Sequence, residues 1–254
     1  MRILIITQDE PFYLADNIDY LIRNIPSHSV IVGCCLFDVS PFGRRESFLQ
    51  KALKTLRIFG VGFFIHYTIR FLSSRIFANK RVKKILKKHR VPIIQLQKSI
   101  NDSDSIELLS SYQPDLLVSI AGNQIFKRPI IDLAPRGCLN LHTALLPKYR
   151  GLMPSFWVLK NGEGQTGVSV FFVDEGIDSG PIIVQESVEI DGRSQEELIR
   201  HTKKIGMDAI IKAINLIENK NYKLIENNAE DKTYYSFPTR KDVLGFLDAG
   251  QRFF

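Results

Sequence analysis

Alternating strand and helix signals near the start of the chain restrict the possible folds strongly. Residues 2–7 are rich in β-branched side chains and predict a buried strand. Residues 16–25 have apolar side chains at helical spacing before a proline, and residues 30–36 form a second apolar run. Because a strand, a helix and a strand with short joins form a right-handed crossover, we expect a parallel sheet covered by helices.

The same alternation continues through most of the chain. It predicts strands at 91–96, 115–121, 137–142, 166–173 and 182–189, and helices at 46–57, 75–89, 102–112, 155–160 and 194–219. The predicted fold class is therefore α/β, with a Rossmann-like, mostly parallel sheet flanked by helices. A basic helical insertion and a short C-terminal extension complete the expected architecture.

Charge is distributed unevenly along the 254 residues. The formal net charge is +7, yet residues 44–90 hold 14 basic residues and one acidic residue, and the remainder holds 20 basic and 26 acidic residues. A basic surface that could bind an anionic partner is therefore expected only in this segment. Three interpretations stay open for it: a solvated helix over a core-packed hairpin, an interfacial element on anionic lipid, or nucleic-acid contact through 75–90.

Composition excludes several classes of protein. Hydrophobic residues make up 44% and charged residues 24%, which argues against a disordered chain. The three cysteines have no zinc-like spacing, so we expect them to be buried and expect no metal site. The apolar run 58–72 is too short to span a bilayer, and an acid follows the N-terminal run too early for a signal peptide. We expect a cytoplasmic location, with the inner face of the membrane as an alternative.

Polar residues gather where the predicted strand 137–142 ends. Asn140 and His142 are two positions apart, so their side chains point to the same face, at the strand end where α/β sheets bind ligands. Asp178 follows in a turn flanked by glycines. An amide can stabilise an oxyanion, an imidazole can support that anion or move a proton, and a carboxylate can orient the imidazole. A hydrogen-bonded histidine with a capping aspartate is the alternative that spacing leaves open.

The stretch 140–185 resembles the folate-dependent formyltransferases, which move a formyl group from 10-formyltetrahydrofolate to an amine. Their pattern is Asn-x-His-x-Ser-x-Leu-Pro-x-Tyr-Arg-Gly, followed by Asn-Gly-Glu, Thr-Gly-Val and Asp-x-Gly-x-Asp-x-Gly. The chain departs from it at Ala144, where the family has serine. It matches the pattern at Asn140, His142, Leu146, Pro147, Tyr149, Arg150, Gly151, Asn161, Gly162, Thr166, Gly167 and Asp178.

The resemblance implies a role for each of these positions. Asn140 and protonated His142 would stabilise the oxyanion formed when an amine attacks the formyl carbon, and Asp178 would orient His142 and help to remove the amine proton. The expected substrate-binding residues are Tyr149 and Arg150, with loop packing or a surface ion pair as the alternative for each. The pterin of the donor would be held by Asn123, Gln124, Ile125, Asp174 and Gly176.

The resemblance also narrows the acceptor amine. The catalytic domain is similar to that of methionyl-tRNA formyltransferases, but those carry an additional barrel-like domain, and only 36 residues follow Glu218 here. Glycinamide ribonucleotide enzymes have a glycine-rich phosphate loop after the first strand, and the corresponding segment 7–17 has no glycine. An amino sugar on a nucleotide carrier is therefore the expected acceptor. Methionyl-tRNA is the second candidate, and a catalytically silent binding module is the third.

These considerations predict how the chain is divided. We expect a formyltransferase catalytic domain over 1–218, which includes the basic insertion 44–90, and an extension over 219–254. We expect the tail to pack onto the body or onto a second subunit, and the resemblance suggests a homodimer formed through it.

Overall fold

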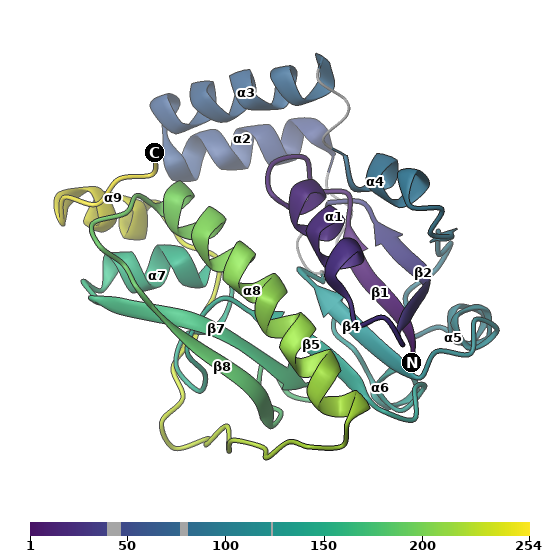
Figure 1. Cartoon of the computed structure of the whole chain (residues 1–254). Coiled ribbons are helices and arrows are strands. Elements are labelled where there is room, and N and C mark those ends of the chain that lie inside the picture. Colours follow the sequence, from purple (N-terminus) through teal and green to yellow (C-terminus); the bar gives the residue numbers. More distant parts are fainter. Residues whose placement is uncertain (40–46, 77–80, 123) are drawn as a thin grey trace.

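The computed structural model describes residues 1–39, 47–76, 81–122 and 124–254. Its centre is a seven-stranded sheet with the order β3-β2-β1-β4-β5-β7-β8 (Figure 1). The first five strands in this order are parallel, while β7 is antiparallel to both β5 and β8. The strands are β1 (Arg2–Gln8), β2 (Val30–Phe37), β3 (Ile93–Ile94), β4 (Leu116–Ile120), β5 (Cys138–His142), β7 (Gln165–Phe172) and β8 (Ile182–Glu189).

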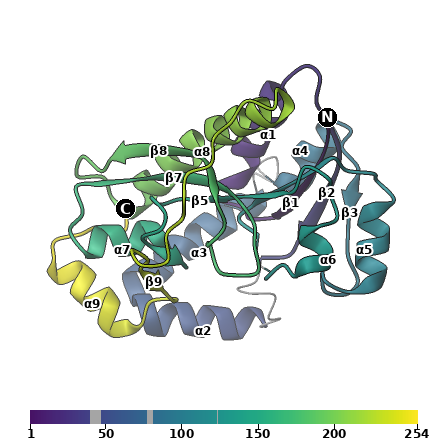
Figure 2. The ribbon, with the colours of Figure 1, turned by 90° about the horizontal axis from the view of Figure 1, so that it is seen from below.

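Helices cover both faces of the sheet, so the predicted α/β architecture is confirmed (Figure 2). Successive residues of a strand point to opposite faces, and β1 accordingly supplies Ile3 and Ile5 to one core and Leu4 and Ile6 to the other. The first core is closed by α1 (Leu14–Asn24), α4 (Val82–Lys88) and α8 (Gln195–Glu218). The second is closed by α5 (Ser103–Ser110) and α6 (Arg128–Ile131).

A third core joins the insertion and the C-terminal tail to the rest of the chain. The antiparallel hairpin of α2 (Phe48–Phe59) and α3 (Val61–Ile76) lies beside the C-terminus (Figure 1). Phe59 of α2 packs with Phe156 of α7 (Pro154–Lys160), Phe246 of α9 (Arg240–Asp248) and Phe253. The expectation that the tail packs onto the body is therefore confirmed.

Several elements differ from the sequence-based prediction. Of the helix expected at 75–89, the structure has α4 over Val82–Lys88, while residues 75–76 belong to α3 and residues 77–80 lie outside the described part. The apolar run 58–72, for which no element was predicted, lies mostly in α3. The strand expected at 91–96 pairs only at Ile93 and Ile94, as befits an edge strand that follows a proline. None of the described helices has both the length and the apolar character needed to cross a bilayer.

The strand order changes direction between β1 and β4, the kind of place where α/β sheets bind ligands. Side chains of β1 fix this point: Thr7 Oγ1 donates to the carbonyl of Ile120 at 2.8 Å, and Gln8 Nε2 donates to that of Ala121 at 2.7 Å. The carboxyl end of β5 lies next to that of β4 in the same register. The sheet thus brings the ends of β1, β4 and β5 to one edge.

Candidate active site

His142 ends β5, and its imidazole is held from two sides. The residue is 6% exposed. Nε2 lies 2.7 Å from the main-chain oxygen of Tyr149, and Nδ1 lies 3.6 Å from Oδ2 of Asp178. Because a carbonyl oxygen only accepts hydrogen bonds, Nε2 must carry a proton and donate it. A second proton, on Nδ1, would face the carboxylate, so the surroundings of His142 complement an imidazolium.

Asp178 is held by the turn that was predicted to carry it. Its φ of 48° lies in the left-handed region, which non-glycine residues adopt rarely and often at functional sites. Its Oδ2 accepts a hydrogen bond of 2.8 Å from the amide of Gly151, which aims the carboxylate toward His142. Asp174 Oδ1 closes the start of the turn by accepting from Gly176 N at 3.1 Å and Ser179 Oγ at 2.5 Å.

Asn140 lies two positions before His142 on β5, between Ser119 of β4 and Phe171 of β7. It is partly exposed, and its carboxamide makes no hydrogen bond to any residue that the structure describes. The amide therefore remains available to a ligand at the strand end. The structure places Asn140 and His142 on the same face and brings Asp178 to the imidazole.

The C-terminal tail completes the loop that holds His142, a feature that the sequence did not reveal. Thr233 Oγ1 accepts from the amide of Tyr149 at 2.8 Å. The short strand β6 (Arg150–Gly151) pairs in parallel with β9 (Tyr234–Tyr235). Gly151 has a φ of 95°, and a Cβ there would lie 2.3 Å from the carbonyl oxygen of Tyr235. Only glycine permits this close approach of tail and loop.

Asn227 of the tail connects the loop to the turn that carries Asp178. Its Nδ2 donates to the carbonyl oxygens of Asp178 at 2.8 Å and Gly180 at 2.9 Å. Its Oδ1 accepts from Nη2 of Arg150 at 2.7 Å. Arg150 is 6% exposed, and its Nε has no hydrogen-bond partner among the described residues. The guanidinium of Arg150 is thus buried beside the site, where it contacts Asn227 of the tail.

The ring of Tyr149 is also held within the protein. It stacks on Tyr235 with 5.3 Å between centroids, and its hydroxyl donates to Glu163 Oε1 at 2.5 Å and accepts from Asn161 Nδ2 at 3.2 Å. Burial and the bond to Glu163 raise the pKa of the Tyr149 hydroxyl, so it stays protonated. Asn161 and Glu163, which belong to the recognised pattern, therefore fix the loop next to His142.

The loop after β4, predicted to contact the folate, lies at the same edge as Asn140. Gln124 Oε1 accepts from the amide of Ile100 at 2.9 Å, which ties the loop to the segment before α5. Ile125 is 55% exposed, and its carbonyl accepts from Asn101 Nδ2 at 2.8 Å. Asn123, the third predicted contact, lies outside the described residues. The loop thus offers an exposed apolar side chain on a fixed backbone.

Cysteine chemistry does not account for this site. All three cysteines are buried, and burial raises the pKa of Cys34, Cys35 and Cys138, so their reactive thiolate forms are suppressed. Within the described ranges, no three His, Cys, Asp or Glu side chains are grouped so that they could hold a metal ion.

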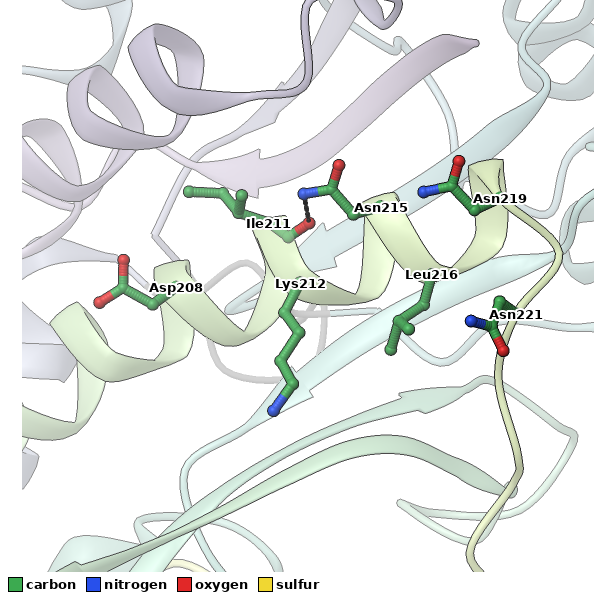
Figure 3. A pocket seen from close by; sticks show the side chains of 7 residues that line it. All are labelled: Asp208, Ile211, Lys212, Asn215, Leu216, Asn219 and Asn221. Atoms are coloured by element: carbon green, nitrogen blue, oxygen red, sulfur yellow. Dashed lines mark hydrogen bonds between the residues drawn. The ribbon is translucent and has the colours of Figure 1, made fainter.

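A shallow groove of about 350 Å³ runs along the outer side of α8 (Figure 3). The groove lies on the other side of the sheet from Asn140 and His142. Helix α8 covers the first core. Cys138, which points to the same face of β5 as Asn140 and His142, packs in the second core. The two charged side chains of the groove are already paired: Lys212 Nζ donates to Glu186 at 2.6 Å, and Asp208 accepts from Tyr20 at 2.7 Å. The groove is therefore separate from the candidate active site.

Comparison with known proteins connects the site to a family. The family model described as formyl transferase matches residues 71–214. A methionyl-tRNA formyltransferase of Kosmotoga olearia is 35% identical over 178 residues, which cover 68% of this chain and 56% of that protein. The chain thus spans about half the length of the curated relatives it matches.

Solved structures share the fold at lower identity. An N-formyltransferase of Helicobacter canadensis, solved with folinic acid and dTDP-3-aminofucose, is 18% identical with a TM-score of 0.60, covering 98% of this chain and 80% of that one. A phosphoribosylglycinamide formyltransferase of Anaplasma phagocytophilum is 18% identical with a TM-score of 0.65, covering 94% and 99%. Since the family model spans more than half of the residues and includes Asn140, His142 and Asp178, the chain belongs to the formyl transferase family.

Proposed function

We propose that the protein transfers a formyl group from 10-formyltetrahydrofolate to the primary amine of a nucleotide-linked amino sugar. The observation that carries this proposal is the buried imidazole of His142, held between Asp178 and a main-chain carbonyl, beside the unbonded carboxamide of Asn140. The site needs no nucleophile of its own, because the acceptor amine supplies it.

The reaction follows from this arrangement. The amine nitrogen attacks the formyl carbon, and the carbonyl oxygen becomes an oxyanion to which the Asn140 amide donates a hydrogen bond. Imidazolium at His142 stabilises the same anion by its charge, which acts strongly in a buried site. The amine proton leaves through Asp178 and water, the bond from carbon to N10 of the folate breaks, and N10 takes up a proton. The products are the formamide and tetrahydrofolate.

The donor would lie between the loop after β4 and the turn 174–180. Ile125 offers an exposed apolar contact for a flat ring, and Gln124 holds the loop in place. The main chain around Gly176 and Asp174 would supply hydrogen bonds to the polar edge of the pterin. Asn123 remains part of this proposal by resemblance alone.

We assign Tyr149 and Arg150 to positioning, although the sequence suggested contact with substrate. Tyr149 supplies the carbonyl that holds His142, and Arg150 is tied through Asn227 to the turn of Asp178. Both side chains are at most 8% exposed. Both residues therefore hold His142 and Asp178 in position.

The structure of the loop between β1 and α1 disfavours binding of a ribonucleotide phosphate there. Glu10 accepts hydrogen bonds from the amides of Phe12 at 2.7 Å, Tyr13 at 2.8 Å and Leu14 at 3.2 Å. These N–H groups at the start of α1 are the ones that would otherwise hold an anion. A phosphate there would have to displace a carboxylate, so the acceptor is not held in the manner of glycinamide ribonucleotide.

Two acceptors remain, and different observations favour them. The Helicobacter canadensis structure with a dTDP-linked amino sugar covers 98% of this chain. The methionyl-tRNA relatives have higher sequence identity but match about two thirds of the chain or less. We favour the amino sugar because the tail packs directly on the catalytic loop, and we keep methionyl-tRNA as the second candidate.

Isotope transfer distinguishes these acceptors. The purified protein is incubated with formyl-labelled 10-formyltetrahydrofolate and either a panel of dTDP- and UDP-linked amino sugars or methionyl-tRNA. Labelled formamide on a sugar nucleotide supports the proposal, whereas label on methionyl-tRNA alone supports the second candidate. If no amine is labelled and folate does not bind, the protein is a silent member of the family.

A further inference from the structure

The outer side of α3 is apolar, which is unusual for a surface helix. Val61, Ile65, Ile69 and Leu72 are 63%, 52%, 62% and 53% exposed. Their spacing of four, four and three residues places them along one face of the helix. A surface helix normally presents charged side chains to water and apolar ones to the core. We call these four residues the α3 stripe.

The inner side of the same helix is already occupied. Phe63 stacks on Phe59 at 4.3 Å, and the ring of His66 stacks on Phe254 at 3.6 Å. Arg70 donates to Glu196 at 2.7 Å and lies over the rings of Phe12, Tyr13 and Tyr67. Because these contacts hold the inner side of α3 against the protein, the stripe faces solvent and is available to a partner.

Charge indicates the nature of that partner. Residues 47–73, which include α2 and most of α3, contain no acidic residue, and the wider segment 44–90 has 14 bases and one acid. Leu49 and Leu53 of α2 are also 67% and 44% exposed. Residues 47–73 thus combine exposed aliphatic side chains with basic residues and no acidic ones, which complements a surface that is both apolar and anionic.

We propose that the α3 stripe is the membrane contact of this protein and inserts into the interface of an anionic bilayer. The 16 residues of α3 give a helix about 24 Å long that would lie in the plane of the membrane. Bases of the segment then attract the anionic headgroups, and the four aliphatic side chains enter the acyl boundary. The contact is peripheral, since no described helix can span a bilayer.

Two other occupants agree less well with the surface. A symmetric dimer through this face would bring each hairpin against its own copy, and bases would then oppose bases. Nucleic acid is bound through phosphates by cations, and aliphatic side chains add nothing to such contacts. Of these three occupants, only a lipid surface contacts both the aliphatic stripe and the positive charge.

The test compares vesicle binding by the wild type and the double variant Ile65→Gln/Ile69→Gln in the full-length protein. Both side chains point to solvent, so circular dichroism and the melting temperature should stay unchanged. The wild type should co-sediment with vesicles of phosphatidylcholine and phosphatidylglycerol and not with phosphatidylcholine alone. The variant should bind the anionic vesicles at least about tenfold more weakly.

A matched control removes exposed apolar side chains elsewhere. Val30 of β2 is 53% exposed, and Leu108 of α5 is 41% exposed. The variant Val30→Gln/Leu108→Gln should therefore bind vesicles like the wild type. Equal binding by the stripe variant, equal binding to neutral vesicles, or no binding at all would each overturn the proposal. The proposal would also be overturned if the wild type formed a dimer or bound tRNA and the stripe variant did not.

Discussion

At the residue scale, the proposed chemistry depends on the hydrogen-bond partners of His142. Tyr149 O and Asp178 Oδ2 are both acceptors, so the imidazole is best satisfied when both of its nitrogens carry protons. Asn140 supplies the other half of the site, a donor that no described residue uses. In the proposed reaction, Asn140 contacts the oxygen of the formyl group, and His142 provides positive charge beside it.

Replacing His142 with alanine should therefore stop catalysis and spare the fold. We expect formyl-transfer kcat to fall by at least about a hundredfold, since both charge and proton transfer are lost. Thermal unfolding should shift by only a few degrees, because the imidazole is one buried contact at the rim of a large core. Near-normal transfer by this variant would exclude His142 from the chemistry.

Asn227 allows a sharper test of positioning. Asn227→Asp keeps an acceptor for Arg150 but loses the donor to the carbonyls of Asp178 and Gly180. We expect kcat to fall about tenfold with KM for the acceptor little changed, because the carboxylate of Asp178 is no longer aimed accurately.

The control for this prediction is Asn219→Asp. Asn219 is exposed at the end of α8 and should tolerate the same change with full activity. If Asn227→Asp kept the wild-type kcat, the side chain of Asn227 would not position Asp178.

At the scale of elements, ion pairs attach α4 to α1. Asp19 of α1 lies 2.6 Å from His89 Nε2 and 3.0 Å from Lys88 Nζ, at the C-terminal end of α4. The hydrogen bond from His89, followed by that from Lys88, lowers the pKa of Asp19 to about 2. The carboxylate is therefore more stable in the folded protein than in the unfolded chain.

The pH dependence of this contact follows from the sign of that shift. A lowered folded-state pKa stabilises the protein above the unfolded value of 3.8, and this stability is lost as the pH falls through about 2. Asp19→Asn should lower the free energy of unfolding by about 1 kcal/mol at pH 5.5, a figure reduced for the solvent exposure of Lys88.

Urea denaturation at several pH values measures this difference. The gap in the free energy of unfolding between wild type and Asp19→Asn should narrow as the pH falls from 3.8 toward 2. Asp231→Asn, at an exposed position without an ion pair among the described residues, should show no such trend. A gap that stays constant with pH would mean that Asp19 acts through packing.

At the scale of the whole molecule, charge and chemistry are separated. The positive net charge comes from residues 44–90, while the rest of the chain, which carries Asn140, His142 and Asp178, is net negative. We therefore expect the basic segment to contribute to docking rather than to formyl transfer.

This separation predicts the behaviour of a charge variant. Lys83→Gln/Lys87→Gln on α4 should change kcat for the acceptor by less than about twofold, since neither side chain belongs to the catalytic loop or its supports. Binding to anionic vesicles should weaken and lose part of its salt dependence. Turnover and vesicle binding, measured on one preparation, check both; a large fall in kcat would place α4 within the acceptor site.

The sequence by itself determined the sheet, most of its strands and helices, and the residues of the proposed chemistry. Periodicity is local, so a strand such as 182–189 can be located from its own residues. Asn140 and His142 share a face because strand geometry requires it, and the motif pointed to Asp178. The ends of elements were less predictable where a short edge strand or helix depends on its neighbours, as at β3 and α4.

Only the tertiary structure decided what supports and surrounds these residues. Asn227 meets Asp178 across 49 positions of sequence, and Thr233 meets Tyr149 across 84. Such contacts depend on how the tail crosses the sheet, which no periodic pattern reports. The same holds for the α3 stripe, because an apolar helix in sequence looks like a core helix until packing shows that its other face is already buried.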